Sequence, residues 1–200
     1  YNLEGLEITA GSFYEQFGSG LIFRSYEEKG LGIDNAMDGI RLKYTPFSGL
    51  NLKTFIGKSR THFTHADGIF RGVDGELNIN ELLNSDSKTK VVIGGGFVSR
   101  YQERENLIFK LPQNVSAYAG RLNIMRGGWA YDGEYAYKIN DPANLLTASS
   151  MNYASGNAFT QNITFSKKGF GFSVEIHRTD NMNLKSDKDK DGKAYLINYI

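Results

Sequence analysis

The sequence predicts an all-β protein, and more specifically an antiparallel up-and-down transmembrane β-barrel, with about ten strands in this chain. Three observations lead to this prediction. Apolar and polar residues alternate with a period of two, the alternating segments are long, and short connections alternate with long ones. Both ends of the 200-residue chain read as interrupted elements, so we interpret residues 1–200 as a single barrel domain that is a fragment of a larger barrel.

Residues 128–138 (GWAYDGEYAYK) show the clearest alternation. Trp129 and Tyr135 fall on one face of this strand, whereas Asp132 and Glu134 fall on the other. A strand with one apolar and one wet face has this pattern. Most such segments span about 9–12 residues, close to the length that a tilted strand needs to cross a bilayer. The predicted strands are residues 5–14, 36–45, 49–59, 69–79, 89–100, 114–125, 128–138, 156–167, 170–179 and 193–200.

The connections between these strands differ in length in a regular way. Tight turns are predicted at residues 46–49, 126–128 and 167–169, and one helical turn (NELLN) is predicted within residues 80–88. Outer-membrane barrels combine short turns at one end with long loops at the other. This asymmetry favours a barrel over a soluble β-sandwich or β-solenoid. The long polar connections are expected at residues 15–35, 60–68, 101–113, 139–155 and 180–192.

The composition excludes several classes of protein. The 23 Lys and Arg residues nearly balance the 22 Asp and Glu residues, whereas a nucleic-acid-binding protein carries a clear basic excess. The chain has 13 Phe, 12 Tyr and 1 Trp, which is too aromatic for a disordered protein. No apolar run reaches the length of a transmembrane helix.

The polar face of each strand would line the interior of the predicted barrel. Its charged residues carry both signs, which fits either wall residues that pair with one another or a charge-lined channel that screens solutes. No preference for cations or anions follows from this balance. The predicted pore-lining residues are Arg41, Lys43, Lys53, Asp74, Glu76, Arg121, Asp132, Glu134, Lys138, Glu175 and His177.

The loop of residues 15–35 is longer than a simple hairpin connection needs to be, and it contains the apolar run LIF at residues 21–23. We expect this loop to fold into the lumen as a constriction or plug. The alternative is an extra hairpin outside the membrane, with residues 20–25 as a short strand. The glycines at residues 94–96, inside a predicted strand, fit either a bulge or the room that an inward-folded loop needs. The predicted constriction residues are Arg24, Glu27, Glu28 and Asp34.

Sequence motifs in the loops and strands point to a known family. GSFYEQFGSGL, RSYEE, LGIDNAMDG and GLNLKTFIGK stand in the first third of the chain, and GGGFVSRYQ, LPQNVSAYAGRLN and DGEYAYKINDP stand later. Together they resemble an uncharacterised porin-like outer-membrane β-barrel family of Bacteroidota, a domain of unknown function. The resemblance covers nearly the whole chain and implies a porin-like barrel in the bacterial outer membrane. It implies no catalytic or binding residues.

One segment has the spacing of a metal site. Asp187, Asp189 and Asp191 take the first, third and fifth positions of a calcium loop, although Asn198 stands where such a loop has a bidentate Glu. A solvated charged loop is the alternative explanation. His62 and His65 form a weaker zinc candidate in another loop.

We expect no enzyme activity and, apart from this candidate Ca²⁺, no cofactor, because the chain lacks a Gly-x-Ser-x-Gly nucleophile motif. The expected function is that of a passive porin or uptake pore for small solutes in the bacterial outer membrane. A plugged accessory or structural barrel of a larger secretion or uptake complex is the first alternative. A soluble extracellular glycan-binding β-protein is the second. The expected partners are outer-membrane lipid and, for the accessory barrel, other outer-membrane proteins, with no nucleic acid.

Overall fold

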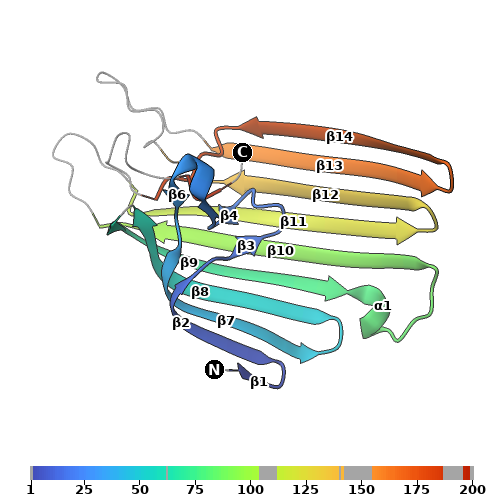
Figure 1. Cartoon of the computed structure of the whole chain (residues 1–200), viewed down its shortest axis with the longest axis horizontal. Coiled ribbons are helices and arrows are strands. Elements are labelled where there is room, and N and C mark those ends of the chain that lie inside the picture. The colour runs from blue at the N-terminus through green and yellow to red at the C-terminus, as the bar shows by residue number, and fades with distance from the viewer. Residues whose placement is uncertain are drawn as a thin grey trace.

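The computed structural model describes residues 2–61, 63–103, 112–139, 141, 155–186 and 196–198, and these form an all-β protein (Figure 1). Its main feature is one ten-stranded sheet in the order β1-β2-β7-β8-β9-β10-β11-β12-β13-β14, with antiparallel neighbours throughout. The strands of this sheet are β1 (Asn2–Leu3), β2 (Leu6–Phe13), β7 (Met37–Phe47), β8 (Leu50–Thr61), β9 (Thr64–Asn78), β10 (Thr89–Tyr101), β11 (Asn114–Arg126), β12 (Trp129–Lys138), β13 (Gly156–Lys167) and β14 (Phe170–Asp180).

The nine strands from β2 to β14 in this sheet confirm the first nine predicted strands in number, order and approximate bounds. Period-two alternation predicted them because it reports directly which residues share a face. The up-and-down order is likewise confirmed within the described residues, since each strand pairs with its neighbours along the chain. β1 is too short to leave a periodic signal, and the sequence does not predict it.

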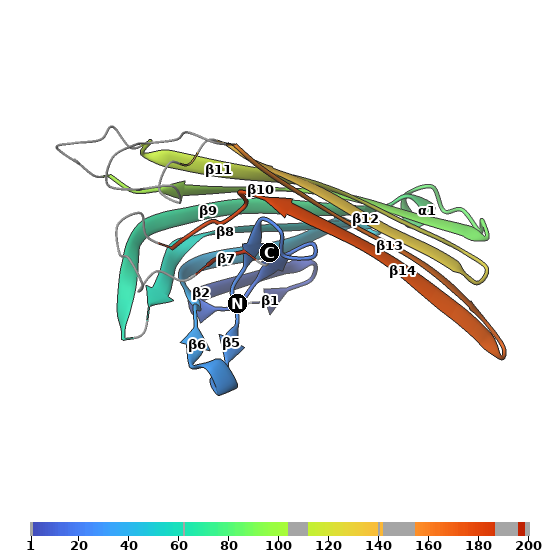
Figure 2. The same ribbon diagram turned by 90° about the horizontal axis from the view of Figure 1, so that it is seen from above.

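The sheet is open and does not close into a barrel. Within the described residues β14 pairs only with β13, and β1 and β2 form the opposite edge. The two edges lie at opposite ends of a curved wall and do not meet (Figures 1 and 2). The described residues therefore do not form a closed barrel on their own.

The three tight turns lie where glycine allows a left-handed backbone. Gly49, Gly127 and Gly169 have φ angles of 94°, 58° and 83° between paired strands. Residues with a side chain rarely adopt such angles, so glycine favours these turns. The predicted helical turn is confirmed as α1 (Ile79–Leu82), capped by the Asn78 side chain, which accepts from the Asn80 and Glu81 backbone N–H groups.

Two predicted elements are wrong where the structure describes them. Residues 60–68 are not a long loop, because β8 continues to Thr61 and β9 begins at Thr64; the backbone ladder extends beyond the apolar part of both strands. Residues 196–198 of the tenth predicted strand do not join the sheet. Leu196 makes an isolated bridge to Lys185, and Ile197 is fully buried. The predicted connections at 101–113 and 139–155 lie largely outside the described residues, and the one at 180–192 is described up to residue 186.

The two faces of the curved sheet differ in what covers them. The inner face, inside the curve in Figure 2, carries Phe55 and Phe70 and is covered by residues 14–36 and by residues 182–186 and 196–198. The outer face carries Ile56 and Tyr135 and is exposed. The core therefore lies between the sheet and the segments on its inner side.

No helix in the part of the chain that the structure describes is long and apolar enough to cross a membrane.

Candidate functional site: the covered inner face of the sheet

Residues 14–36, called the covering segment here, leave the sheet at the end of β2 and return at the start of β7. Phe13 and Met37 are direct partners in the ladder, so the segment is an excursion from a single hairpin. It contains two small hairpins: β3 (Gln16–Phe17) pairs with β4 (Phe23–Arg24), and β5 (Glu27–Glu28) pairs with β6 (Ile33–Asp34) around the 3₁₀ helix η1 (Lys29–Leu31). The first hairpin lies on the inner face, and the second points away from the sheet (Figure 2).

Apolar side chains hold the first hairpin against the sheet. Phe17, Leu21, Ile22 and Phe23 are all at most 1% exposed. The Phe23 ring lies 4.4 Å from the ring of Phe55 on β8 and 5.4 Å from that of Phe17. Burying each such side chain contributes about 1.5–3 kcal/mol, so the hairpin has a core of its own with the sheet.

Small residues on the inner face make room for these side chains. A Cβ added to Gly72 would lie 2.8 Å from the Phe17 ring, and one added to Gly96 would lie 3.0 Å from Ile22 Cδ1. Ala136 and Ala158 pair with each other on the neighbouring strands and are fully buried in the same cluster. The ladder runs without a shift through residues 94–96. Gly72 and Gly96 therefore provide space for the covering segment, and the glycines at residues 94–96 do not form a bulge.

Glu15, at the start of the covering segment, is surrounded by cations from the sheet. Its carboxylate lies 3.5 Å from Arg41, 3.2 Å from Lys43 and 3.2 Å from Lys53. Burial alone would raise the pKa of Glu15, but Lys53, the Gln16 amide and Lys43 outweigh it and hold this pKa below its ordinary value. The ionised carboxylate thus ties the segment to β7 and β8.

The tip of the first hairpin meets a second ionic cluster on β9, β11 and β12. The backbone N–H of Ser19 donates to Glu134 Oε2 at 2.7 Å. Arg121 forms ion pairs with Asp74 at 2.8 Å and with Glu76 at 3.3 Å. Asp74, Arg121 and Glu134 are all buried, and Gly18 packs directly over them. The tip covers the buried members of this cluster, whereas the Glu76 side chain stays 44% exposed.

Residues 182–186 and 196–198 cover the inner face beside the hairpin. Lys138 Nζ donates to the Asn183 carbonyl at 2.8 Å, and Arg100 Nη1 donates to the Lys185 carbonyl at 2.6 Å. The Asn198 amide donates to the carbonyls of Leu21 and Met182. One side chain therefore connects this part of the chain to the covering segment.

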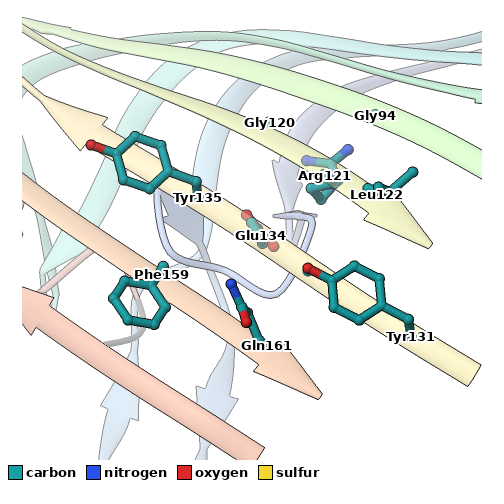
Figure 3. Close-up of a pocket in the computed structure, with 10 residues that line it drawn as sticks. Gly94, Gly120, Arg121, Leu122, Tyr131, Glu134, Tyr135, Phe159 and Gln161 are labelled. Atoms are coloured by element: carbon teal, nitrogen blue, oxygen red, sulfur yellow. The ribbon is translucent and has the colours of Figure 1, made fainter. Parts of the chain in front are cut away.

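The outer face has the opposite character. On β12, the outward residues from Trp129 to Tyr137 are all aromatic or glycine. Figure 3 shows Tyr131, Tyr135 and Phe159 beside a shallow trough of about 550 Å³ in this face. The Tyr131 ring lies against Gly133, and this ring covers the strand backbone that the glycine leaves bare.

The model of a family of unknown function, DUF6029, matches residues 1–200. The chain belongs to the DUF6029 family. No curated protein and no solved structure matches it. Membership in the DUF6029 family indicates neither a cellular location nor an activity for the chain.

The predicted pore-lining residues of this DUF6029 chain lie together on the inner face of the sheet, as the registers of β7 to β14 require. They fall into three groups. Asp74, Glu76, Arg121 and Asp132 lie on β9, β11 and β12. The covering segment and residues 182–186 contact Arg41, Lys43, Lys53, Glu134 and Lys138. The inner face of β14, with Glu175 and His177, is exposed. Lining of a pore remains a prediction for all of them.

Of the predicted constriction residues, Arg24 lies on β4 of the first hairpin, and Glu27, Glu28 and Asp34 lie on the second hairpin. Glu27 and Glu28 are exposed on the second hairpin. Asp34 pairs with Arg60 at 2.8 Å, and Arg24 stacks on the Tyr26 ring at 4.4 Å. The predicted short strand within residues 20–25 exists as β4, but its side chains pack on the inner face of the sheet.

The predicted metal ligands cannot be placed together. Asp187, Asp189 and Asp191 lie outside the described residues, as does His62. The Asn198 side chain already bonds to three backbone groups. Among the residues that the structure describes, no three acidic or histidine side chains converge as ligands of one metal ion.

The covering segment's attachment points are what sequence reasoning missed. Glu15, Ser19 and Phe55 belong to the site, yet they were not singled out. The inward-facing Gly72 and Gly96 are the signal that could have indicated what packs there, because a wall that faces open water has no need of such gaps.

Proposed function

We propose that this DUF6029 chain forms part of the wall of a transmembrane β-barrel in the bacterial outer membrane, and that the covering segment plugs its interior. The barrel would be an uptake pore for small polar solutes that is closed at rest. Closure of the wall would require further strands at the edges formed by β2 and β14, because a barrel in lipid leaves no edge unpaired.

The observation that carries the proposal is the exposed apolar character of the outer face. Ile40, Ile56, Val73, Ile93 and Ile163, from five different strands, are 40–54% exposed there. On β14 the outward residues Phe170, Phe172, Val174 and Ile176 continue this surface. A soluble protein rarely exposes so extended an apolar face, whereas lipid would cover it.

Aromatic residues near the strand ends support the same placement. Trp129, Phe165 and Phe172 form one cluster at the turn end, with ring centroids 4.8–5.9 Å apart. Phe97 and Tyr118 pair at 5.1 Å nearer the other end. From Trp129 to Tyr137 along β12 is about 27 Å, or about 20 Å of height at a tilt of about 40°. Belts of aromatic residues flank the apolar band of outer-membrane barrels.

The covering segment would close the barrel interior because it packs against the sheet as part of a folded core. Phe17, Ile22 and Phe23 are fully buried against the sheet, and Glu15 is paired on three sides. A loop that merely narrowed a water-filled passage would leave such groups wet. The same dry core favours a second candidate, a permanently plugged accessory barrel within a larger envelope complex.

Ion conductance across planar bilayers tests the proposal. Because Phe13 and Met37 are paired, deletion of residues 15–35 leaves Tyr14 and Ala36 as a two-residue hairpin loop. In a barrel that contains this chain together with the strands that close its wall, the intact protein should be silent or rarely open, and the deletion variant should conduct steadily. The matched control deletes residues 27–34 only, where Asn35 N–H bonds to the Tyr26 carbonyl, and should stay closed.

Each other outcome favours a different account. Steady conductance of the full chain would overturn the closed resting state and support a passive porin. Insertion into the bilayer without conductance in either deletion variant would favour the accessory barrel. A protein that stays in solution without detergent would contradict the membrane location and support the glycan-binding alternative.

A further inference from the structure

A polar cavity remains on the inner face next to the tip of the covering segment. It has a volume of about 280 Å³ and is bounded by Gly18 and Ser19 on one side and by β11, β12 and β13 on the other. Two adjacent cross-strand rows supply its floor: Arg121–Glu134–Thr160 and Asn123–Asp132–Asn162. All six of these side chains are polar or charged.

The charges around this cavity do not balance. Glu76, Asp132 and Glu134 line it together with a single guanidinium, that of Arg121. Arg121 is already engaged by Asp74 and Glu76. Asp132 accepts a hydrogen bond from the neutral Asn123 amide at 2.6 Å. Negative charge is therefore in excess here.

Glu134 provides a second, independent sign of a missing partner. The residue is 7% exposed, and its Oε2 accepts from the Ser19 N–H at 2.7 Å. Its Oε1 is buried and meets no donor in ordinary hydrogen-bond geometry among the described residues, although the Ser19 hydroxyl also interacts with this carboxylate. A buried carboxylate oxygen without a donor is costly, so a site that supplies a donor from a ligand accounts for it.

The arrangement fits an organic cation better than a metal ion. No three acidic or histidine side chains of the described residues converge closely enough to ligate a metal. The acids are spread over a cavity in which Asn123, Asn162 and Thr160 add hydrogen-bonding groups. A molecule with separated N–H donors can reach several of these groups at once.

We infer that this cavity binds a small organic cation that carries ammonium or guanidinium groups, and that the cation pairs with Glu134 and Asp132 beside the tip of the covering segment. The inference deepens the proposed function by naming the class of solute and rests on the inner face being the barrel interior. Because Glu134 also accepts from Ser19, a bound cation would compete with the tip for the same carboxylate.

Isothermal titration calorimetry of the folded full chain in detergent tests the inference, with agmatine as the probe and 1,4-butanediol as an uncharged comparator. Agmatine should bind and butanediol should not. Glu134→Gln and Asp132→Asn should each weaken agmatine binding by about tenfold or more, since each removes a charge-assisted hydrogen bond. The matched control Glu4→Gln, at an exposed acid in the turn between β1 and β2, should bind like the unmodified chain.

Absence of agmatine binding, equal binding of butanediol, or unchanged affinity in Asp132→Asn would each overturn the inference. Asp132 is exposed, so its variant keeps the test decisive even where Glu134→Gln fails to fold. Binding in detergent does not depend on conductance. A deletion variant that stays silent in the bilayer, with intact agmatine binding by the full chain, would therefore count against the pore. A conducting deletion variant, with no agmatine binding by the full chain, would count against the cation site.

Discussion

Replacement of Phe23 by Ala should release the first hairpin of the covering segment from the sheet. Phe23 is fully buried and packs against Phe55 at 4.4 Å and Phe17 at 5.4 Å between ring centroids. Truncation of a buried Phe costs about 3–5 kcal/mol. No backbone bond of the ten-stranded sheet involves this residue, so the loss should fall on the hairpin and leave the sheet folded.

Hydrogen exchange of the hairpin amides measures this loss. Since 1.36 kcal/mol corresponds to a factor of ten, exchange of residues 15–25 should accelerate by roughly 10²–10⁴-fold, with little change in β9 to β12. Leu31→Ala is the matched control, because Leu31 belongs to the same segment but is 73% exposed. Unchanged exchange in Phe23→Ala, or equal acceleration across the sheet, would refute the reasoning.

Three further changes test the other contacts. Glu15→Gln should lower the midpoint of urea-induced unfolding at pH 7 by an amount equivalent to about 1–3 kcal/mol. The folded pKa of Glu15 is depressed, so this contribution is present above about pH 4.5 and is lost as the pH falls through the folded pKa. The difference in stability between the two proteins should therefore shrink as the pH falls below about 4.5. Gly96→Val should expose the covering segment to proteases because its Cβ would crowd Ile22, whereas Gly120→Val, with nothing within 4 Å, should not; equal cleavage of both would contradict this. Ile93→Arg, on the outer face, should cost about 2–4 kcal/mol in a bilayer, and a cost under about 0.5 kcal/mol would indicate a face in water.

The strands and their faces could be predicted because a period of two fixes both at once. Asp132 and Glu134 lie on the inner face and Tyr135 on the outer face, as their alternation predicts. Residues 60–68 could not be predicted correctly, since backbone pairing between Arg60 and His65 needs no apolar signal. Pairing between strands that are distant in the sequence leaves no local pattern either. The sequence therefore does not show that β14 pairs with β13 alone among the described strands.

The site was predictable in part. The aromatic content of residues 15–35 and the glycines at 94–96 both suggested an inward fold, and the first hairpin lies on the inner face beside Gly96. The partners of that hairpin depend on contacts between residues far apart in sequence. Ser19 meets Glu134 across 115 positions, and no local pattern in either strand or loop encodes such a distance.

Quenching of Trp129 fluorescence by brominated lipids tests most directly whether the outer face meets lipid. Trp129 is the only tryptophan of the chain, it lies on the outer face, and it is 51% exposed. In vesicles that contain brominated phosphatidylcholine, its emission should be strongly quenched, while aqueous iodide should have little effect. Emission that is insensitive to brominated lipid and quenched by iodide would contradict the membrane placement of this sheet.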